Sequence, residues 1–189
     1  MAFFAEVDSE HGRDVAFAAR VHAVKQKYFR AAASGLTIRP GVLRLVAEAR
    51  AASVGLAIAT TASLESALAV IGHVPGLAEA FDAIATGDDV VAKKPAPDVY
   101  RVALARLERG AETCIAIEDA ELGLRSALAA GVATIVTPSS YTRDENFTGA
   151  AAVLSDLGEP AAPAVSLAGP PPPRGYVDIA YLSALLRSG

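Results

Sequence analysis

Several polar side chains in this 189-residue sequence stand directly after short apolar runs, where they could do chemistry. Thr60 and Thr61 follow "LAIA", and Glu118 and Asp119 follow "CIAI". Lys94 lies in the segment "GDDVVAKK" that follows the run "DAIAT". Carboxylate oxygens hold Mg²⁺, a lysine neutralises a transferring phosphoryl group, and a hydroxyl donates a hydrogen bond to it. Together these residue types predict phosphate chemistry.

Each of these residues also has a simpler interpretation. Thr60 could cap the helix that follows it, as threonine often does. Lys94 could be solvated, as a surface lysine usually is, and Lys93 stands beside it. Glu118 and Asp119 could be acids favoured by a helix N-terminus. The functional interpretation depends on all of them meeting at one place.

The fold prediction explains why they should meet. Five apolar runs read as buried strands, and helical patterns with apolar residues at i, i+3, i+4 and i+7 separate them. The predicted strands are Leu56–Thr60, Asp82–Thr86, Cys114–Glu118, Ala133–Thr137 and Ala151–Ser155. Strand–helix alternation with near-continuous apolar strands predicts a doubly wound parallel α/β sheet, whose ligands bind at the carboxyl ends of the strands.

The helical patterns have recognisable limits. Residues 42–49 follow "RPG", residues 98–110 have Asp98 as a predicted N-cap and Gly110 as a stop, and residues 120–131 end at Gly131. These patterns predict a helix in each of the three ranges.

The chain divides into three segments. Residues 1–35 contain a helical pattern over 11–34 and are predicted to form a small helical appendage. Residues 36–158 hold the α/β alternation. Residues 159–189 are rich in Pro, Gly and Ala and predict a linker that ends in a short helix. The four prolines from Pro170 to Pro173 favour extended polyproline II; a use in partner binding is the alternative to a plain spacer.

Composition limits the kind of protein. Apolar residues make up 52% of the chain, enough to bury a core. The net charge is −4 with no basic block, so neither nucleic acid nor an anionic membrane is a predicted partner. Cys114 is the only cysteine, no apolar run is long enough to cross a bilayer, and no secretory signal is recognised. We expect a cytoplasmic protein and make no prediction of its oligomeric state.

Three segments, in order, resemble motifs two, three and four of the haloacid dehalogenase superfamily of phosphohydrolases. They are "AIATTAS", "KKPAPDVY" and "IAIEDAELGLRSALAAG". The intervening "FDAIATGDD" and the later "TPSSYTRDENFTGA" are most similar to the CbbY-like branch, whose characterised members resemble xylulose-1,5-bisphosphate phosphatases. The resemblance implies a Rossmann-like core with a reduced helical cap.

The resemblance also implies a role for each residue. Thr60 would contact the phosphoryl oxygens with Thr61 beside it, and Lys94 would stabilise the transition state and position the nucleophile. Asp119 would coordinate Mg²⁺, with Glu118 helping directly or through water. Tyr141 and Thr142 match the branch pattern without an implied role.

The family's first motif, an apolar strand ending in D-x-D-G-T, has no match here. Its first Asp forms an aspartyl-phosphate and its second acts as acid and base. Glu6 and Asp8 have the spacing but no Gly-Thr follows, and "DSEHGRDVAF" aligns better with the segment after that motif. We therefore expect the nucleophile to lie upstream. In the family's fold that strand lies between the strands that end at Thr60 and Glu118. Without it, each of these two strands would have one edge with no ladder partner.

Three functions remain open. The first is an Mg²⁺-dependent phosphatase of a small sugar phosphate or bisphosphate, incomplete in this chain. The second is an inactive, phosphate-binding relative. The third is a β-phosphoglucomutase-like phosphotransferase, because that relative shares the three motifs.

Overall fold

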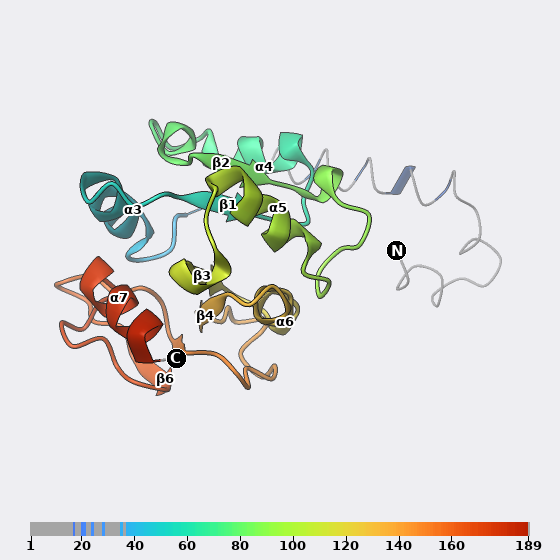
Figure 1. Cartoon of the computed structure of the whole chain (residues 1–189). Coiled ribbons are helices and arrows are strands. Elements are labelled where there is room, and N and C mark those ends of the chain that lie inside the picture. Colours follow the sequence, from blue (N-terminus) through green and yellow to red (C-terminus); the bar gives the residue numbers. More distant parts are fainter. Residues whose placement is uncertain are drawn as a thin grey trace.

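The computed structural model describes residues 37–188, together with Phe17, Arg20, Val21, Val24, Tyr28 and Gly35. The predicted appendage over residues 1–35 therefore lies almost wholly outside the described residues, as do Glu6 and Asp8. From residue 37 onward the chain alternates between helices and strands, as the sequence predicts (Figure 1).

Each of the five predicted apolar runs contains a strand. The strands are β1 (Ala57–Ala59), β2 (Ala83–Ala85), β3 (Ile115–Glu118), β4 (Ala133–Val136), β5 (Ala152–Leu154) and the unpredicted β6 (Ser166–Ala168). All pairs among β1 to β5 are parallel, and β6 is antiparallel to β5. The predicted α/β class with parallel strands is confirmed.

The helix expected after Thr60 is α4, for which the sequence patterns gave no limits. The helices are α3 (Val42–Ala51), α4 (Leu64–Ile71), α5 (Asp98–Leu107), α6 (Glu121–Ala129) and α7 (Ile179–Ser188), with the 3₁₀ turns η1 (Ala78–Ala80), η2 (Gly87–Asp89) and η3 (Ala111–Thr113). None of the helices within this part of the chain is long and apolar enough to span a membrane.

Helix α5 differs from its predicted limits at both ends. Asp98 is its first residue, and Pro97 occupies the N-cap position. The helix ends at Leu107 because Glu108 adopts a left-handed conformation with φ of 55° and its N–H bonds back to Ala105. The chain therefore leaves the helix before it reaches Gly110.

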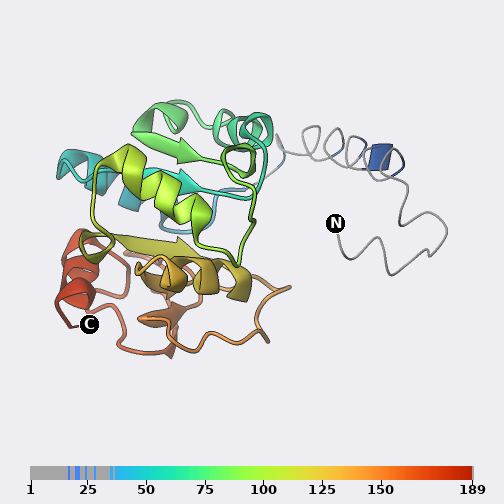
Figure 2. The same cartoon turned by 45° about the vertical axis from the view of Figure 1, so that its right-hand side comes forward.

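The described strands form two sheets. One holds β1 and β2, and the other has the order β3-β4-β5-β6. Among the described residues, β1 pairs with β2 alone and β3 with β4 alone. Each therefore has one edge without a ladder partner, which agrees with the expectation from the family's fold. The arrows of β1, β2 and β3 nevertheless point the same way (Figure 2). The residues that follow β1 and end β3 thus face the same end of the molecule.

Helix α5 holds the two sheets together. It packs on β1 and β2, and its buried Val99, Tyr100 and Ala103 form one cluster with Ala85 of β2 and Ala116 of β3. Strands β1 and β2 each have the sequence Ala-Ile-Ala, so the helix can approach them closely. One helix therefore fixes the separation between the two sheet edges.

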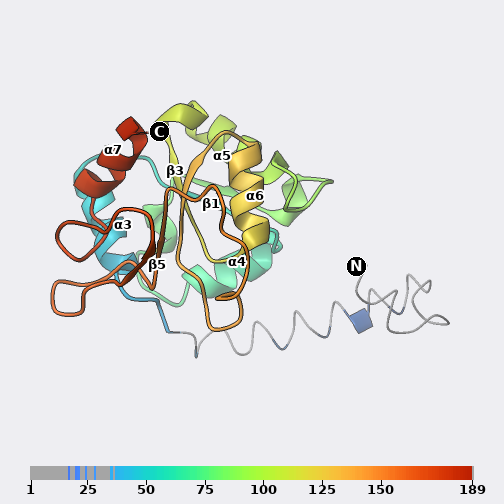
Figure 3. The ribbon, with the colours of Figure 1, turned by 90° about the horizontal axis from the view of Figure 1, so that it is seen from below.

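The C-terminal segment differs from the predicted linker. Strand β6 extends the second sheet, and α7 packs against α3 on the face opposite α5 and α6 (Figure 3). Val177, Tyr181 and Leu185 are buried in a cluster with Leu45 of α3 and Leu154 of β5. The short terminal helix that the sequence predicts is present, and it completes a core.

Candidate active site

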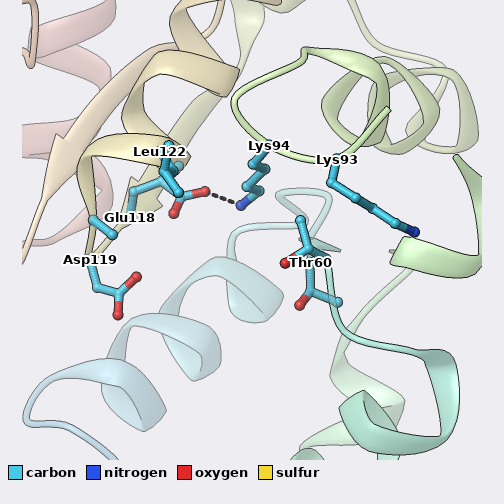
Figure 4. Close-up of a pocket in the computed structure, with 9 residues that line it drawn as sticks. Thr60, Lys93, Lys94, Glu118, Asp119 and Leu122 are labelled. Carbon is cyan, nitrogen blue, oxygen red and sulfur yellow. Dashed lines mark hydrogen bonds and ion pairs between the residues drawn. The ribbon is translucent and has the colours of Figure 1, made fainter. Parts of the chain in front are cut away.

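A cavity of about 490 Å³ opens at the carboxyl ends of β1 and β3. Its walls contain every site residue that the sequence predicts, although these come from segments up to 59 positions apart. The lining residues are Thr60, Thr61, Lys93, Lys94, Glu118, Asp119, Ala120, Leu122 and Gly123 (Figure 4). The predicted convergence of a hydroxyl, a lysine and a carboxylate pair is therefore present in the structure.

Thr60 is held by the end of the first sheet. Its N–H donates to the carbonyl of Ala85 at 2.9 Å, and its Oγ1 accepts from the N–H of Ala62 at 3.1 Å. Ser63, not Thr60, is the N-cap of α4, and it accepts from Ser66. The simpler interpretation of Thr60 as a helix cap is therefore wrong, and its hydroxyl proton makes no bond to another described residue.

The two adjacent lysines have different partners. Lys93 directs its ammonium to the carbonyls of Gly87 and Val90, away from the acid pair. Lys94 directs its ammonium at Glu118, with Nζ 2.5 Å from Oε1 (Figure 4). The loop that carries Lys94 is anchored at Ala96, whose carbonyl accepts from the fully buried Ser126 of α6 at 2.6 Å. Lys94 is thus the lysine that faces the second sheet.

Glu118 is enclosed on both sides. Its Oε1 accepts from Lys94 and from the hydroxyl of Tyr100. Its Oε2 lies against Gly123 of α6, where a Cβ would collide with it. Burial, followed by the charge of Glu118, raises the pKa of Tyr100 well above its usual range, so this phenol remains a hydrogen-bond donor.

Asp119 is exposed, and its carboxylate is turned away from the Lys94–Glu118 pair (Figure 4). Its backbone carbonyl accepts from Oγ1 of Thr142 at 2.5 Å. In the same loop, Glu145 accepts from the N–H of Glu121 at 2.6 Å, which caps the start of α6. The loop after β4 thus fixes the backbone around Asp119, while the side chain stays available.

The acid pair fits a hard cation in part. Carboxylate oxygens are ligands that Mg²⁺ accepts, and Asp119 makes no hydrogen bond with its carboxylate among residues 37–188. Within the described residues, however, no group of three or more His, Cys, Asp and Glu side chains could hold a metal ion. Any cation bound here would need ligands besides Glu118 and Asp119.

A second, smaller cavity of about 260 Å³ shares the acid pair with the first. It is lined by Arg39, Pro40, Val42, Ile117, Glu118, Asp119, Thr137 and Leu157. The guanidinium of Arg39 donates to the carbonyls of Thr137, Pro138 and Ser155 and so joins the ends of β4 and β5. Ile117 is 39% exposed although it lies in a strand. Open space therefore adjoins the unpaired edge of β3 on both sides of the acid pair.

The sequence patterns did not indicate Tyr100, Gly123 or the role of Thr142. Tyr100 lies on the buried face of α5, and its spacing from Lys94 would have allowed both to reach one carboxylate. A glycine inside α6 was a further signal, because glycine in a helix interior destabilises unless something needs the space. Thr142 matched the branch pattern, but nothing in the sequence indicated its bond to the backbone carbonyl of Asp119.

Parallel strands of the two sheets carry acids, a lysine and a hydroxyl to one end of the molecule, which is the arrangement expected of an α/β enzyme that binds phosphate. A haloacid dehalogenase-like hydrolase family model matches residues 2–131, and the chain belongs to this family. Within it the chain lies in the CbbY-like branch. It is 45% identical over 147 residues to the plasmid protein CbbY of Cupriavidus necator, covering 76% of this chain and 58% of that protein.

CbbY from Cereibacter sphaeroides is 44% identical over 147 residues, which cover 75% of this chain and 63% of that protein. The chain thus spans about six-tenths of the length of these two relatives. The crystal structure of Rhodobacter sphaeroides CbbY with xylulose 1,5-bisphosphate aligns with a TM-score of 0.69 at 44% identity, covering 74% of this chain and 65% of that one. A β-phosphoglucomutase from Clostridium difficile, at 19% identity and a TM-score of 0.70, covers 90% of this chain and 67% of that one, and it shows the likeness of fold alone.

Proposed function

We propose that this chain carries the core of an Mg²⁺-dependent phosphohydrolase that acts on a small phosphorylated sugar. One observation carries the proposal: Thr60, Lys94 and the acid pair meet in one cavity, although separate segments supply them. The CbbY structure that contains xylulose 1,5-bisphosphate supports a sugar bisphosphate as the substrate class.

The geometry supports a division of roles. Thr60 would donate its hydroxyl proton to a phosphoryl oxygen, and Thr61 would lie beside the phosphoryl group. Lys94 would neutralise charge that develops on the phosphoryl group, because its ammonium has N–H bonds besides the one given to Glu118. Asp119 would be the metal ligand, and Glu118 would hold Lys94 in place. A bound Mg²⁺ would supply charge neutralisation at the phosphate.

The nucleophile belongs to a different segment in this proposal. Among the described residues, Glu118 and Asp119 are the only acids that line the cavity, and both are assigned other roles. Strand β1 is an edge of the first sheet and β3 is an edge of the second. Among the described residues, neither edge has a further strand paired to it. A strand between them that ended in D-x-D would place its aspartates beside Lys94 and Asp119, and the first would form the aspartyl-phosphate.

An activity assay tests the proposal. The purified 189-residue chain and a version extended upstream by a D-x-D-G-T strand are compared on a generic phosphate ester, with and without Mg²⁺. We expect turnover in the extended version that disappears in Asp119→Asn and on removal of Mg²⁺. An inactive extended version would contradict the enzyme proposal.

A second candidate is a module that binds phosphate without turnover. The small number of acids in the described part of the cavity favours it, because a two-carboxylate site is a weak Mg²⁺ site. Orthophosphate binding by the 189-residue chain, with no hydrolysis by either version, would be its signature. Hydrolysis by the 189-residue chain that Asp119→Asn abolishes would eliminate it.

A further inference from the structure

Tyr100 contacts both members of the partly buried ion pair between Lys94 and Glu118. It lies in the first turn of α5 and is 8% exposed. Its hydroxyl donates to Oε1 of Glu118, the oxygen that also accepts from Lys94. Its ring lies under the ammonium of Lys94, with Nζ 5.0 Å from the ring centroid, which is within the range of a cation–π contact.

The position of Glu118 depends on these contacts. Gly123 leaves room for Oε2 on one side, and Tyr100 and Lys94 hold Oε1 on the other. A carboxylate that accepts from one neutral and one charged donor spreads its charge over both. It therefore holds the ammonium less tightly than a carboxylate whose only donor is that ammonium.

We infer that Tyr100 is a positioning residue of the phosphoryl-binding site: by sharing the carboxylate of Glu118, it leaves the ammonium of Lys94 able to turn an N–H toward a phosphate oxygen. The inference rests on the proposed function, because it concerns the same cavity. It assigns Tyr100 no contact with the substrate. The residue acts through Glu118 on Lys94.

The test uses two matched substitutions in the 189-residue chain. Tyr100→Phe removes the hydroxyl that binds Glu118. Tyr181→Phe removes the hydroxyl of another buried tyrosine, which donates to the carbonyl of Pro170 at 2.6 Å within the C-terminal segment. Each variant loses one buried hydroxyl and one hydrogen bond, so a purely structural effect should be similar in both.

Two readouts are taken. The first is the NMR signal of the Lys94 side chain in protein labelled at lysine Cε, which the Lys94→Gln variant identifies among the four lysines. The second is the dissociation constant of orthophosphate, measured by titration. We expect Tyr100→Phe to move the Lys94 signal and to weaken phosphate binding about three- to tenfold, less than the loss of a direct charge-assisted hydrogen bond, because Tyr100 acts on the phosphate only through Glu118 and Lys94. Tyr181→Phe should change neither.

The outcomes separate this inference from the proposed function. If wild type binds no orthophosphate, the proposed phosphate-binding site is refuted for this chain. The Lys94 signal alone then decides whether Tyr100 positions the lysine. A signal that moves in Tyr100→Phe supports positioning. An unmoved Lys94 signal overturns the inference, and where wild type binds orthophosphate, equal phosphate affinity in the two variants overturns it as well. Either result leaves Tyr100 as a core residue.

Discussion

The ammonium of Lys94 lies 2.5 Å from Oε1 of Glu118, and the two side chains are only 13% and 9% exposed. One comes from the loop before α5, which packs on the first sheet, and the other ends β3 of the second sheet. Since each charge has left most of its water, each depends on the other. The pair therefore links the two sheets, and it also holds the ammonium of Lys94 in the candidate active site.

Replacing Lys94 by Gln should abolish orthophosphate binding and lower the free energy of unfolding by about 2–4 kcal/mol, because Glu118 would keep a buried charge without its counter-ion. Urea unfolding and phosphate titration measure the two effects. Lys93→Gln is the matched control, since the partners of Lys93 among the described residues are the backbone carbonyls of Gly87 and Val90, and it should change stability by less than about 1 kcal/mol. Equal effects of the two substitutions would refute the distinction between these lysines.

Replacing Gly123 by Ala should destabilise the protein, even though alanine favours a helix over glycine by about 1 kcal/mol. The added methyl group would collide with Oε2 of Glu118 and displace this carboxylate from Lys94. In a Glu118→Ala background the collision is gone, so the same substitution should become neutral or stabilising. A double-mutant cycle of unfolding free energies measures this change of sign. An identical effect in both backgrounds would contradict the proposed contact.

Stability should depend on the pH through Asp89 of η2. The guanidinium of Arg106 and the N–H and hydroxyl of Thr86 hold the pKa of Asp89 well below its usual range. A carboxyl whose pKa is lower in the folded state stabilises fully above its unfolded pKa of about 4 and loses that contribution as the pH falls through the folded value.

The variant Asp89→Asn should therefore be less stable than wild type at neutral pH, with a difference that shrinks below a pH of about 4. Urea unfolding over a pH series measures the difference. A gap between the two proteins that stays constant down to acid pH would show that the charge of Asp89 is not responsible.

The C-terminal segment should contribute to the core. Val177 is fully buried with Leu157 and Tyr181, so Val177→Ala should lower the free energy of unfolding by about 2 kcal/mol through lost burial and a cavity. Val165 precedes β6 and is 60% exposed, so Val165→Ala should have an effect below about 0.5 kcal/mol. Calorimetry or urea unfolding compares them. Equal, small effects would mean that the segment is the plain spacer expected from its composition.

The sequence was informative wherever the signal is local. Runs such as "CIAIE" predict a strand because a short, nearly continuous apolar stretch bounded by turn residues is typical of a strand that is buried on both faces. The same runs fix which residue comes at the strand end, so Thr60, Glu118 and Asp119 could be predicted. Composition misled where proline and glycine are frequent. Residues after Gly158 look like a linker, yet β6 and α7 form there because β5 and α3 offer an edge and an apolar face.

The sequence by itself determined the order of strands β1 to β5, the set of residues at their ends and, through three motifs, the family. Only the tertiary structure decided which partners those residues have. It gave Lys94 and Lys93 different partners and brought Tyr100 and Gly123 against Glu118, because such contacts depend on how the helices and the two sheets pack. Within the described part of the chain, it also left the carboxylate of Asp119 without a hydrogen bond. Distances across packed elements arise from the volumes of side chains far apart in the chain, and no local pattern records them.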